Sequence, residues 1–403
     1  MLSPLHNNRP EISIVGAGAA GCFCAAQLHE ALPGADIRIL EAGPRPLAKL
    51  ALTGGGRCNI SNTFEYIHSL DEVYPRGASL MKRALAEFSY KNTLEWFERR
   101  GARFVVEDGG RIFPASQDAL EIVDVLLKSI KGVRLECNCR VSVLPESDAV
   151  VLTTGGGAGM DILKSLPVET TPPVPSLFSF NISDTPDGGR SGITSLMGLT
   201  QDVALSIPGT KMRSEGDLLI TDWGFSGPAA LRLSSYAARH LAGCGYNSPV
   251  MVRWLKENES AIGKELTDIR SANPRKLMKS VHPEGLTARL WEHILSRCAF
   301  RDGQTWAEVG GKGINRLAQT LLCDTYFIHG KTRFKEEFVT CGGVSLSSVN
   351  MNSLECKRLP GLFFAGELLD VDAVTGGFNL QAAWSTAYVA AKSIIERYDT
   401  QNH

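Results

Sequence analysis

The first forty residues change their pattern of hydrophobic and polar positions in a way that predicts strand, helix and strand. Residues 12–15 form a short β-type run, and residues 22–32 have the length of a helix. The pair at 33–34 is Pro-Gly, which ends the helix, and residues 36–40 form a second β-type run. This order predicts an α/β fold with a Rossmann-like sheet.

The next hundred residues continue with helices and short strands. We expect helices over 77–100 and 118–131. In the second of these, Leu120, Val123, Leu127 and Ile130 recur at helical spacing and predict the buried face. Short β-type runs at 133–135, 141–143 and 149–152 predict further strands, and the last run is apolar throughout.

The middle of the chain has a different pattern, which predicts an inserted domain. A proline-rich segment at 170–176 is the first candidate boundary. Short β-type runs then alternate with turn clusters up to residue 251, and helical patterns occupy 252–322. We therefore expect residues 1–165 and 334–403 to form one discontinuous nucleotide-binding domain. The insert should comprise a β-rich, barrel-like or sandwich-like part at 166–251 and a helical part at 252–333.

A glycine motif lies where the first strand meets the first helix. It reads Gly16-Ala17-Gly18-Ala19-Ala20-Gly21, the G-x-G-x-x-G spacing of dinucleotide sites. The glycines allow a tight turn, close approach of a diphosphate and tight helix packing. Glu41 follows the last glycine by 41 − 21 = 20 residues, the offset of a ribose-binding acid. A glycine-rich turn of another α/β unit is the alternative, and the motif alone does not separate FAD from NAD.

The loop at 47–62 is rich in glycine and in hydrogen-bond donors. Such a loop suits an electron-rich cofactor edge or an anionic substrate, and the alternative is a surface loop with a solvated arginine. We predict that its cofactor-binding residues are Lys49, Thr53, Gly54, Gly55, Gly56, Arg57, Cys58 and Asn59. Because Cys58 has no partner at C-x-x-C spacing, we expect it to have a packing role.

The carboxyl-terminal segment contains a second glycine-opened helix start. A short apolar strand at 361–367 ends in an acid, and a helix follows, with Trp384, Tyr388, Ala391 and Ile395 on one face. Such a helix start can hold the negative charge of a reduced flavin, which favours FAD over NAD. A plain strand-turn-helix is the alternative. The predicted cofactor residues here are Gly366, Glu367, Asp370, Gly376, Gly377, Phe378, Asn379 and Leu380.

Composition and charge narrow the possible partners. The 403 residues carry a net charge of −1, which offers no general field for a polyanion, so we expect no nucleic-acid partner. The basic side chains Arg270, Arg275, Lys276 and Lys279 are interpreted as a solvated face. No stretch is apolar enough to predict a membrane span, and the first ten residues do not resemble a signal peptide, so we expect a cytoplasmic protein. The ten cysteines show no metal-binding spacing, and we expect free thiols and no metal.

Several motifs together resemble the BaiN/YhiN-like NAD(P)/FAD-dependent oxidoreductases. In chain order they are TGGGRCNISN at 53–62, RIFP at 111–114, GFSGP at 224–228, CGGV at 341–344 and the segment 361–381. The resemblance covers nearly the whole chain. It implies a flavoprotein fold with two dinucleotide-binding domains and an inserted domain. It also implies FAD as cofactor, NAD(P)H as reductant, and reduction of a carbon–carbon double bond in a small hydrophobic ring system.

The resemblance also suggests roles for further residues. It places Val141 near the adenine, and it implies cofactor contacts for Ala42, Thr154, Gly155 and Gly156. Arg57 and Asp222 are the candidate catalytic residues. Asp222 replaces a histidine that is usual in the family, and it would serve as a proton donor only with a raised pKa. The alternative is that Asp222 and Ser226 cap the helix that begins near Pro228.

Three functions fit these observations. The first is an FAD-dependent reductase of a small substrate. The second is a flavin-dependent enzyme that modifies RNA, which would bind RNA through the face formed by Arg270, Arg275, Lys276 and Lys279. The third is a flavin-binding sensor or assembly factor without turnover.

Overall fold

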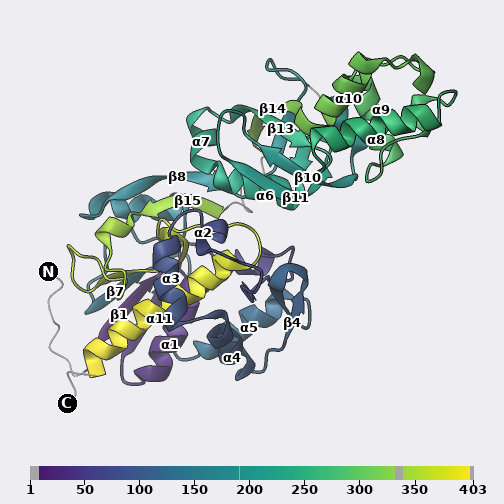
Figure 1. Ribbon diagram of the computed structural model, residues 1–403. Coiled ribbons are helices and arrows are strands. Elements are labelled where there is room, and N and C mark those ends of the chain that lie inside the picture. The colour runs from purple at the N-terminus through teal and green to yellow at the C-terminus, as the bar shows by residue number, and fades with distance from the viewer. Residues whose placement is uncertain (1–8, 190, 332–338, 400–403) are drawn as a thin grey trace. The chain divides into compact units, whose positions relative to one another are not determined.

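A computed structural model describes residues 9–189, 191–331 and 339–399 (Figure 1). By contacts between residues the chain divides into two compact units, Met1–Ser176 with Lys335–His403, and Leu177–Phe334. The first segment of this unit ends eleven residues later than the boundary that we expected after residue 165. The expected return at residue 334 lies outside the described residues.

The first unit is built on a five-stranded parallel sheet in the order β16-β7-β1-β2-β6. In the central strand, Ile14 lies opposite Ile39 on one side and Val151 on the other. The central strands are covered on both faces, which explains their short apolar runs. The bounds are β1 Glu11–Val15, β2 Asp36–Leu40, β6 Arg134–Glu136, β7 Ala149–Leu152 and β16 Leu362–Phe364.

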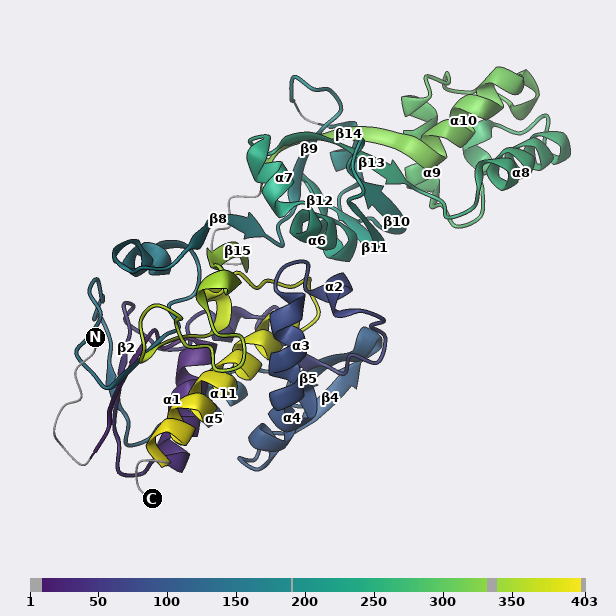
Figure 2. The ribbon, with the colours of Figure 1, turned by 60° about the vertical axis from the view of Figure 1, so that its left-hand side comes forward.

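Two helices far apart in sequence pack together on this sheet. They are α1 (Ala19–Ala31) and the long α11 (Phe378–Asp399), which lie side by side in both views (Figures 1 and 2). We expected α11 to bury one face. Instead residues 381–387 are all buried, and polar residues belong to its core. Gln381 accepts hydrogen bonds from Ser61 Oγ (2.6 Å) and Thr93 Oγ1 (3.0 Å).

Smaller elements complete the first unit. The predicted helix at 77–100 is two helices, because Ser89 begins the second one with a capping box. In α5 the core face is formed by Ala119, Ile122, Val125 and Leu126. Of the predicted face, Ile130 is buried, but Leu120 is 55% exposed, so the prediction was wrong there. The bounds are α2 Leu70–Val73, α3 Ala78–Glu87, α4 Tyr90–Glu98, α5 Ala119–Ser129, and a three-stranded sheet of β3 Ser61–Asn62, β5 Arg111–Pro114 and β4 Phe104–Glu107.

One expected strand is absent from this unit. Residues 141–143 form no strand, and Val143 is 74% exposed. The proline-rich segment, our first candidate boundary, forms strand β8 (Thr170–Ser176), which pairs antiparallel with β15 (Val339–Val344). Proline is tolerated there because each strand of a two-stranded sheet has a free edge. We call this pair the β8–β15 ribbon (Figure 2).

The second unit contains a closed barrel in the order β10-β11-β12-β9-β14-β13. Strand β14 joins the barrel after the helical segment, so the β-rich part is not confined to residues before 252. The predicted fold class, a discontinuous Rossmann-like domain with an inserted barrel-like and helical domain, is confirmed. The bounds are β9 Phe180–Ser183, β10 Thr200–Ser206, β11 Arg213–Ile220, β12 Gly224–Ser226, β13 Asn247–Arg253 and β14 Asp324–Lys331, with helices α6 Gly227–Tyr236, α7 Ala238–Gly243, α8 Glu259–Ala272, α9 Ala288–Arg297 and α10 Gly311–Cys323.

A buried polar network ties α9 to β14 in this unit. Tyr326 donates to Asp324 (2.8 Å) and lies 3.1 Å from His293 Nε2, and Arg297 donates to the same aspartate (2.7 Å). Burial, and to a smaller extent the nearby Arg297, lower the pKa of His293 to about 4. The imidazole is therefore neutral near pH 7.

None of the helices in the described ranges combines the length and hydropathy needed to cross a bilayer.

Candidate cofactor site

Two glycines of the motif are required by the protein itself. Gly16 has φ +105°, and a Cβ built there would lie 2.6 Å from the carbonyl oxygen of Thr153. A Cβ at Gly21 would lie 1.9 Å from the carbonyl oxygen of Gly16, where the helix meets the turn. The Thr153 hydroxyl donates to the carbonyls of Val15 (3.0 Å) and Gly16 (2.9 Å) and holds the turn to β7.

Gly18 differs from these two glycines because the protein does not crowd it. It precedes α1 with an extended backbone, φ −79° and ψ −170°, and a Cβ there would meet no atom within 4 Å. Gly18 also lines a cavity at the start of the helix. The first N–H groups of a helix have no partner inside the helix and attract negative charge. Space in front of these groups fits a diphosphate.

Glu41 holds the turn from the opposite side. Its Oε2 accepts from the N–H of Ala17 (2.7 Å) and its Oε1 from the N–H of Gly43 (2.7 Å). A carboxylate can accept about four hydrogen bonds, so acceptor sites remain after these two. The side chain is half-buried at the end of β2, with its carboxylate fixed for a hydroxyl-bearing ligand.

Two cavities meet at Glu41. One of about 390 Å³ extends from α1 to the start of α11, and another of about 370 Å³ extends past the end of β2. Both are lined by Gly16, Glu41 and Thr154. The predicted residues on the first cavity are Gly16, Ala17, Gly18, Ala19, Ala20, Glu41, Lys49, Thr53, Thr154, Gly155, Gly366, Glu367, Asn379 and Leu380. The second cavity adds Ala42 and Val141.

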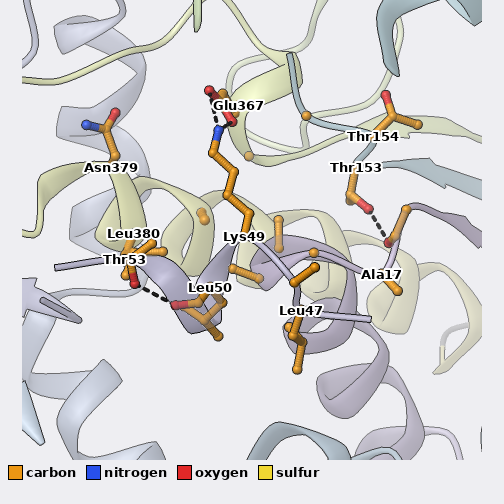
Figure 3. Close-up of a pocket in the computed structure, with 18 of the residues that line it drawn as sticks. Ala17, Leu47, Lys49, Leu50, Thr53, Thr153, Thr154, Glu367, Asn379 and Leu380 are labelled. Carbon is orange, nitrogen blue, oxygen red and sulfur yellow. Dashed lines mark hydrogen bonds and ion pairs between the residues drawn. The ribbon is translucent and has the colours of Figure 1, made fainter. Parts of the chain in front are cut away.

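An ion pair lies on the first cavity. Lys49 Nζ lies 2.8 Å from Glu367 Oε2, and Figure 3 shows the lysine pointing toward this carboxylate. The side chains are 52% and 23% exposed, so the pair remains accessible to a ligand. The other carboxylate oxygen accepts from the N–H of Thr340 (2.7 Å).

The rest of the TGGGRCNISN loop does not line this cavity. Arg57 turns to the β4–β5 hairpin, where it pairs with Glu107 (2.9 Å), bonds Gln117 (2.8 Å) and lies 4.1 Å from the ring centre of Phe113. Burial raises the pKa of the Cys58 thiol to about 12, and a hydrogen bond with Thr53 opposes this shift. Gly54, Gly55 and Gly56 form a left-handed turn with φ between 60° and 82°.

The two glycine-rich segments nevertheless contact each other, as a shared site requires. With the Asn59 amide oriented to satisfy its neighbours, its oxygen accepts from the N–H of Gly377 (3.1 Å). Asn62 donates to the carbonyl of Gly376 (3.0 Å). Phe378 is buried in the core at the start of α11. These contacts fix the helix start whose next residues, Asn379 and Leu380, line the cavity.

The remaining predicted residues lie away from the cavity lining. A Cβ at Gly156 would lie 1.8 Å from the hydroxyl oxygen of Thr340, so this glycine permits packing on β15. Asp370 accepts from Thr171 Oγ1 (3.0 Å). Asp222 belongs to the second unit and is exposed. The capping interpretation was wrong, because α6 begins at Gly227 and the Ser226 hydroxyl bonds Ser179 Oγ (2.7 Å) without capping the helix.

The sequence did not predict several residues that line the cavities. One is Thr153, which stands directly before the predicted Thr154. Its hydroxyl links the end of β7 to the carbonyls of Val15 and Gly16. No local signal distinguishes the others, which reach the cavity through tertiary packing. They include Arg45, Leu47, Ala48, Leu50, Val371, Ala382 and Ala383 on the first cavity and Cys139, Arg140, Ser142, Gly159, Asp161 and Ile162 on the second.

Comparison with known families gives a match over most of the chain. The family described as HI0933-like protein Rossmann domain matches residues 10–154 and 146–393. The chain belongs to the HI0933-like family. This membership confirms the resemblance inferred from the motifs.

Relatives of this HI0933-like chain are named for two activities, reduction of a bile acid and synthesis of dihydrouridine in ribosomal RNA. A 3-dehydro-bile acid delta(4,6)-reductase of Clostridium scindens is 28% identical, with 96% of this chain and 99% of the relative aligned. The ribosomal RNA dihydrouridine synthases of Haemophilus influenzae and Escherichia coli are each 26% identical. Their alignments cover 94% and 95% of this chain, and 97% of each relative.

Proposed function

We propose that this protein is an FAD-dependent oxidoreductase. The observation that supports the proposal is the pair of cavities that meet at Glu41, with open space at Gly18 on the first of them. A dinucleotide needs room for a base and ribose on one side of a diphosphate and for a second group on the other. Both cavities belong to the first unit, and their donor sets suit these parts.

Each part of FAD has a matching set of residues. The turn at 16–21 would bind the diphosphate through its N–H groups, and Glu41 would accept hydrogen bonds from the adenosine ribose. Val141 lines the cavity proposed for the adenine. Asn379 and Leu380, at the positive end of α11, would face the electron-rich end of the flavin. When bound, FAD supplies the hydride or electron transfer, and the protein orients and shields it.

We further propose that the reaction is reduction of a carbon–carbon double bond in a small hydrophobic or cyclic substrate, with NAD(P)H as reductant. The relatives' names support this class, because a delta(4,6)-reductase and a dihydrouridine synthase both add hydrogen across such a bond. Arg57 and Asp222 remain the candidate catalytic residues. Arg57 would act only after leaving Glu107, and Asp222 only if its loop reaches the substrate.

The purified protein tests the proposal directly. We expect a yellow protein that releases FAD, not FMN, on denaturation. Stopped-flow mixing with NADH and NADPH should reduce the flavin, and anaerobic mixing of the reduced flavin with cyclic enones and other unsaturated compounds should identify the acceptor. A colourless protein that takes up no added FAD would contradict the proposal. Reduction by neither nucleotide would contradict NAD(P)H as donor.

A second candidate function is reduction of a uridine base in RNA. The names of two relatives favour it, and so does one segment of the second unit. Residues 270–280 include four basic residues and no acid, and Arg275, Lys276 and Lys279 are exposed. Such side chains can bind phosphates and release counterions.

RNA binding can be measured with matched charge reversals. Replacing Arg275, Lys276 and Lys279 together by Glu should lower the salt dependence of RNA binding, with the slope of log K against log salt falling by about 2. The control reverses three exposed basic residues of the first unit, Lys82, Lys91 and Arg103. Equal loss in both variants, or no RNA binding by the parent protein, would exclude this surface.

A further inference from the structure

The β8–β15 ribbon carries the chain from the first unit into the second. Ser176 ends β8 and the first unit, and Leu177 begins the second unit. The ribbon's contacts on the first unit come largely from one short segment, residues 366–372.

Three carboxylates of this segment hold the ribbon at successive points. We call them the carboxylate ladder, and each accepts a hydrogen bond from a ribbon residue. The bonds are Thr340 N to Glu367 Oε1 (2.7 Å), Thr171 Oγ1 to Asp370 Oδ2 (3.0 Å) and Ser176 Oγ to Asp372 Oδ2 (2.9 Å). The Asp370 N–H also donates to the carbonyl of Val344 (2.9 Å), so backbone and side chains act together.

The segment that bears the ladder is also cavity wall. Glu367 and Val371 line the proposed flavin cavity, and so does Val339 at the start of β15. Thr340, the next ribbon residue, packs directly on Gly156 of the turn after β7. The start of β15 thus lines the cavity through Val339, while no residue of β8 lines it.

The far end of the ladder is rigidly held. The Asp372 side chain is fully buried and accepts from Arg76 Nε (2.6 Å), with a second bond from the Arg76 guanidinium to its other oxygen. A buried, paired carboxylate has little freedom to rotate, because its partners fix both oxygens. The hydroxyl of Ser176 is therefore held at a defined position.

Leu177, the first residue after β8, has a strained backbone. Its φ is +56°, a conformation that bulky residues rarely adopt. Its neighbours are anchored on both sides, Ser176 by Asp372 and Phe178 through its N–H to Ser234 Oγ (2.9 Å). Such strain persists where the surroundings determine the conformation.

We propose that the carboxylate ladder transmits occupancy of the cofactor cavity to the β8–β15 ribbon. The inference rests on the proposed function, since FAD is the ligand that fills the cavity. A filled cavity restricts Val339, Glu367 and Val371. The ladder passes this restriction to β8, which has no contact with the cavity. Asp370 and Asp372 are thus positioning residues.

Hydrogen exchange of the full-length protein with and without FAD tests the proposal. Three of the seven β8 residues are proline, which has no N–H, so the amides of residues 341–344 in β15 are the readout. These residues do not line the cavity. We expect FAD to slow their exchange about tenfold. The double variant Thr171→Val, Ser176→Ala removes the two β8 side-chain bonds and should reduce this protection to about twofold, with FAD affinity changed less than about threefold.

Thr170→Val is the matched control, because Thr170 is an exposed residue of the same strand. It should keep the full FAD-dependent protection. Protection confined to the cavity residues, or equal ribbon protection in the double variant and the parent, would overturn the inference while leaving FAD binding intact. Absorbance of the same samples reports FAD uptake separately, and absence of uptake in the parent would overturn the proposed function and the inference together.

Discussion

Replacing Gly18 by alanine should separate cofactor binding from folding. A Cβ at this position meets no protein atom within 4 Å, and φ −79° with ψ −170° suits alanine. The cofactor-free protein should therefore keep its stability or gain up to about 1 kcal/mol, because alanine restricts the unfolded chain. The methyl group would occupy the space proposed for the diphosphate. We expect FAD binding to weaken by about 1 to 3 kcal/mol, the cost of overpacking a close contact, or roughly 5- to 150-fold in Kd.

The same substitution at Gly21 provides the contrast. There the Cβ would lie 1.9 Å from the carbonyl oxygen of Gly16, inside the protein. Gly21→Ala should lower the melting temperature without any cofactor present. The two variants carry the same added methyl group three residues apart, so a difference between them reflects the surroundings of each glycine.

Fluorescence titration gives the FAD affinity, and thermal melts with and without FAD give the two stabilities. At 100 times its Kd, FAD should stabilise the parent protein by about 2.7 kcal/mol. At the same concentration, a 30-fold weaker Gly18→Ala variant should gain only about 1 kcal/mol. The reasoning is refuted if Gly18→Ala binds FAD as tightly as the parent, or if it destabilises the cofactor-free protein as much as Gly21→Ala does.

Other expectations follow from the titratable groups and the cofactor cavity. Glu41→Ala should weaken FAD binding by about 1 to 3 kcal/mol in the same titration, because a charged hydrogen-bond acceptor is lost, whereas Glu98→Ala on the exposed end of α4 should not. The pKa of His293 is lowered to about 4, so the unfolded chain binds the proton first and stability should fall by at most about 3 kcal/mol as the pH drops from about 6.5 to 4. His293→Gln should remove this dependence in melts followed by tryptophan fluorescence. The Cys58 thiol, whose pKa is raised to about 12, should resist iodoacetamide at pH 8 while exposed Cys244 is labelled, and Cys58→Ser should leave flavin reoxidation unchanged.

The sequence predicted the features whose residue pattern is local and lies at the cofactor cavity. At Gly21 the need for glycine is local, because a Cβ there would meet the carbonyl oxygen of Gly16, five residues earlier, and Glu41 follows the adjacent strand. The cofactor cavity lies at this turn, so the motif located one part of its lining. The start of α11 was predictable for the same reason, because Gly376 and Gly377 both have positive φ and open the helix.

The features that escaped prediction depend on partners far away in the chain. Strand β14 closes the barrel only after the helical segment, and β8 becomes a strand only because β15 lies beside it. Local hydrophobic periodicity carries no information about such pairing. The direction of Arg57 is a similar case, since Glu107 and Gln117 draw it to the hairpin. In α5 an apolar face at helical spacing was present, but Leu120 is exposed.

The division of the nucleotide unit by an insert has a consequence for synthesis. Strand β16 and helix α11 complete the sheet and the layer on α1, yet the ribosome makes them only after all of residues 177–331. Domains usually fold as units during synthesis. The barrel with its helices can therefore fold on the nascent chain. Until β16 and α11 are made, the apolar surface of α1 and of the early strands remains uncovered. A ribosome stall before residue 378 should leave a chain with a folded second unit, no cofactor site, and an exposed face that chaperones recognise.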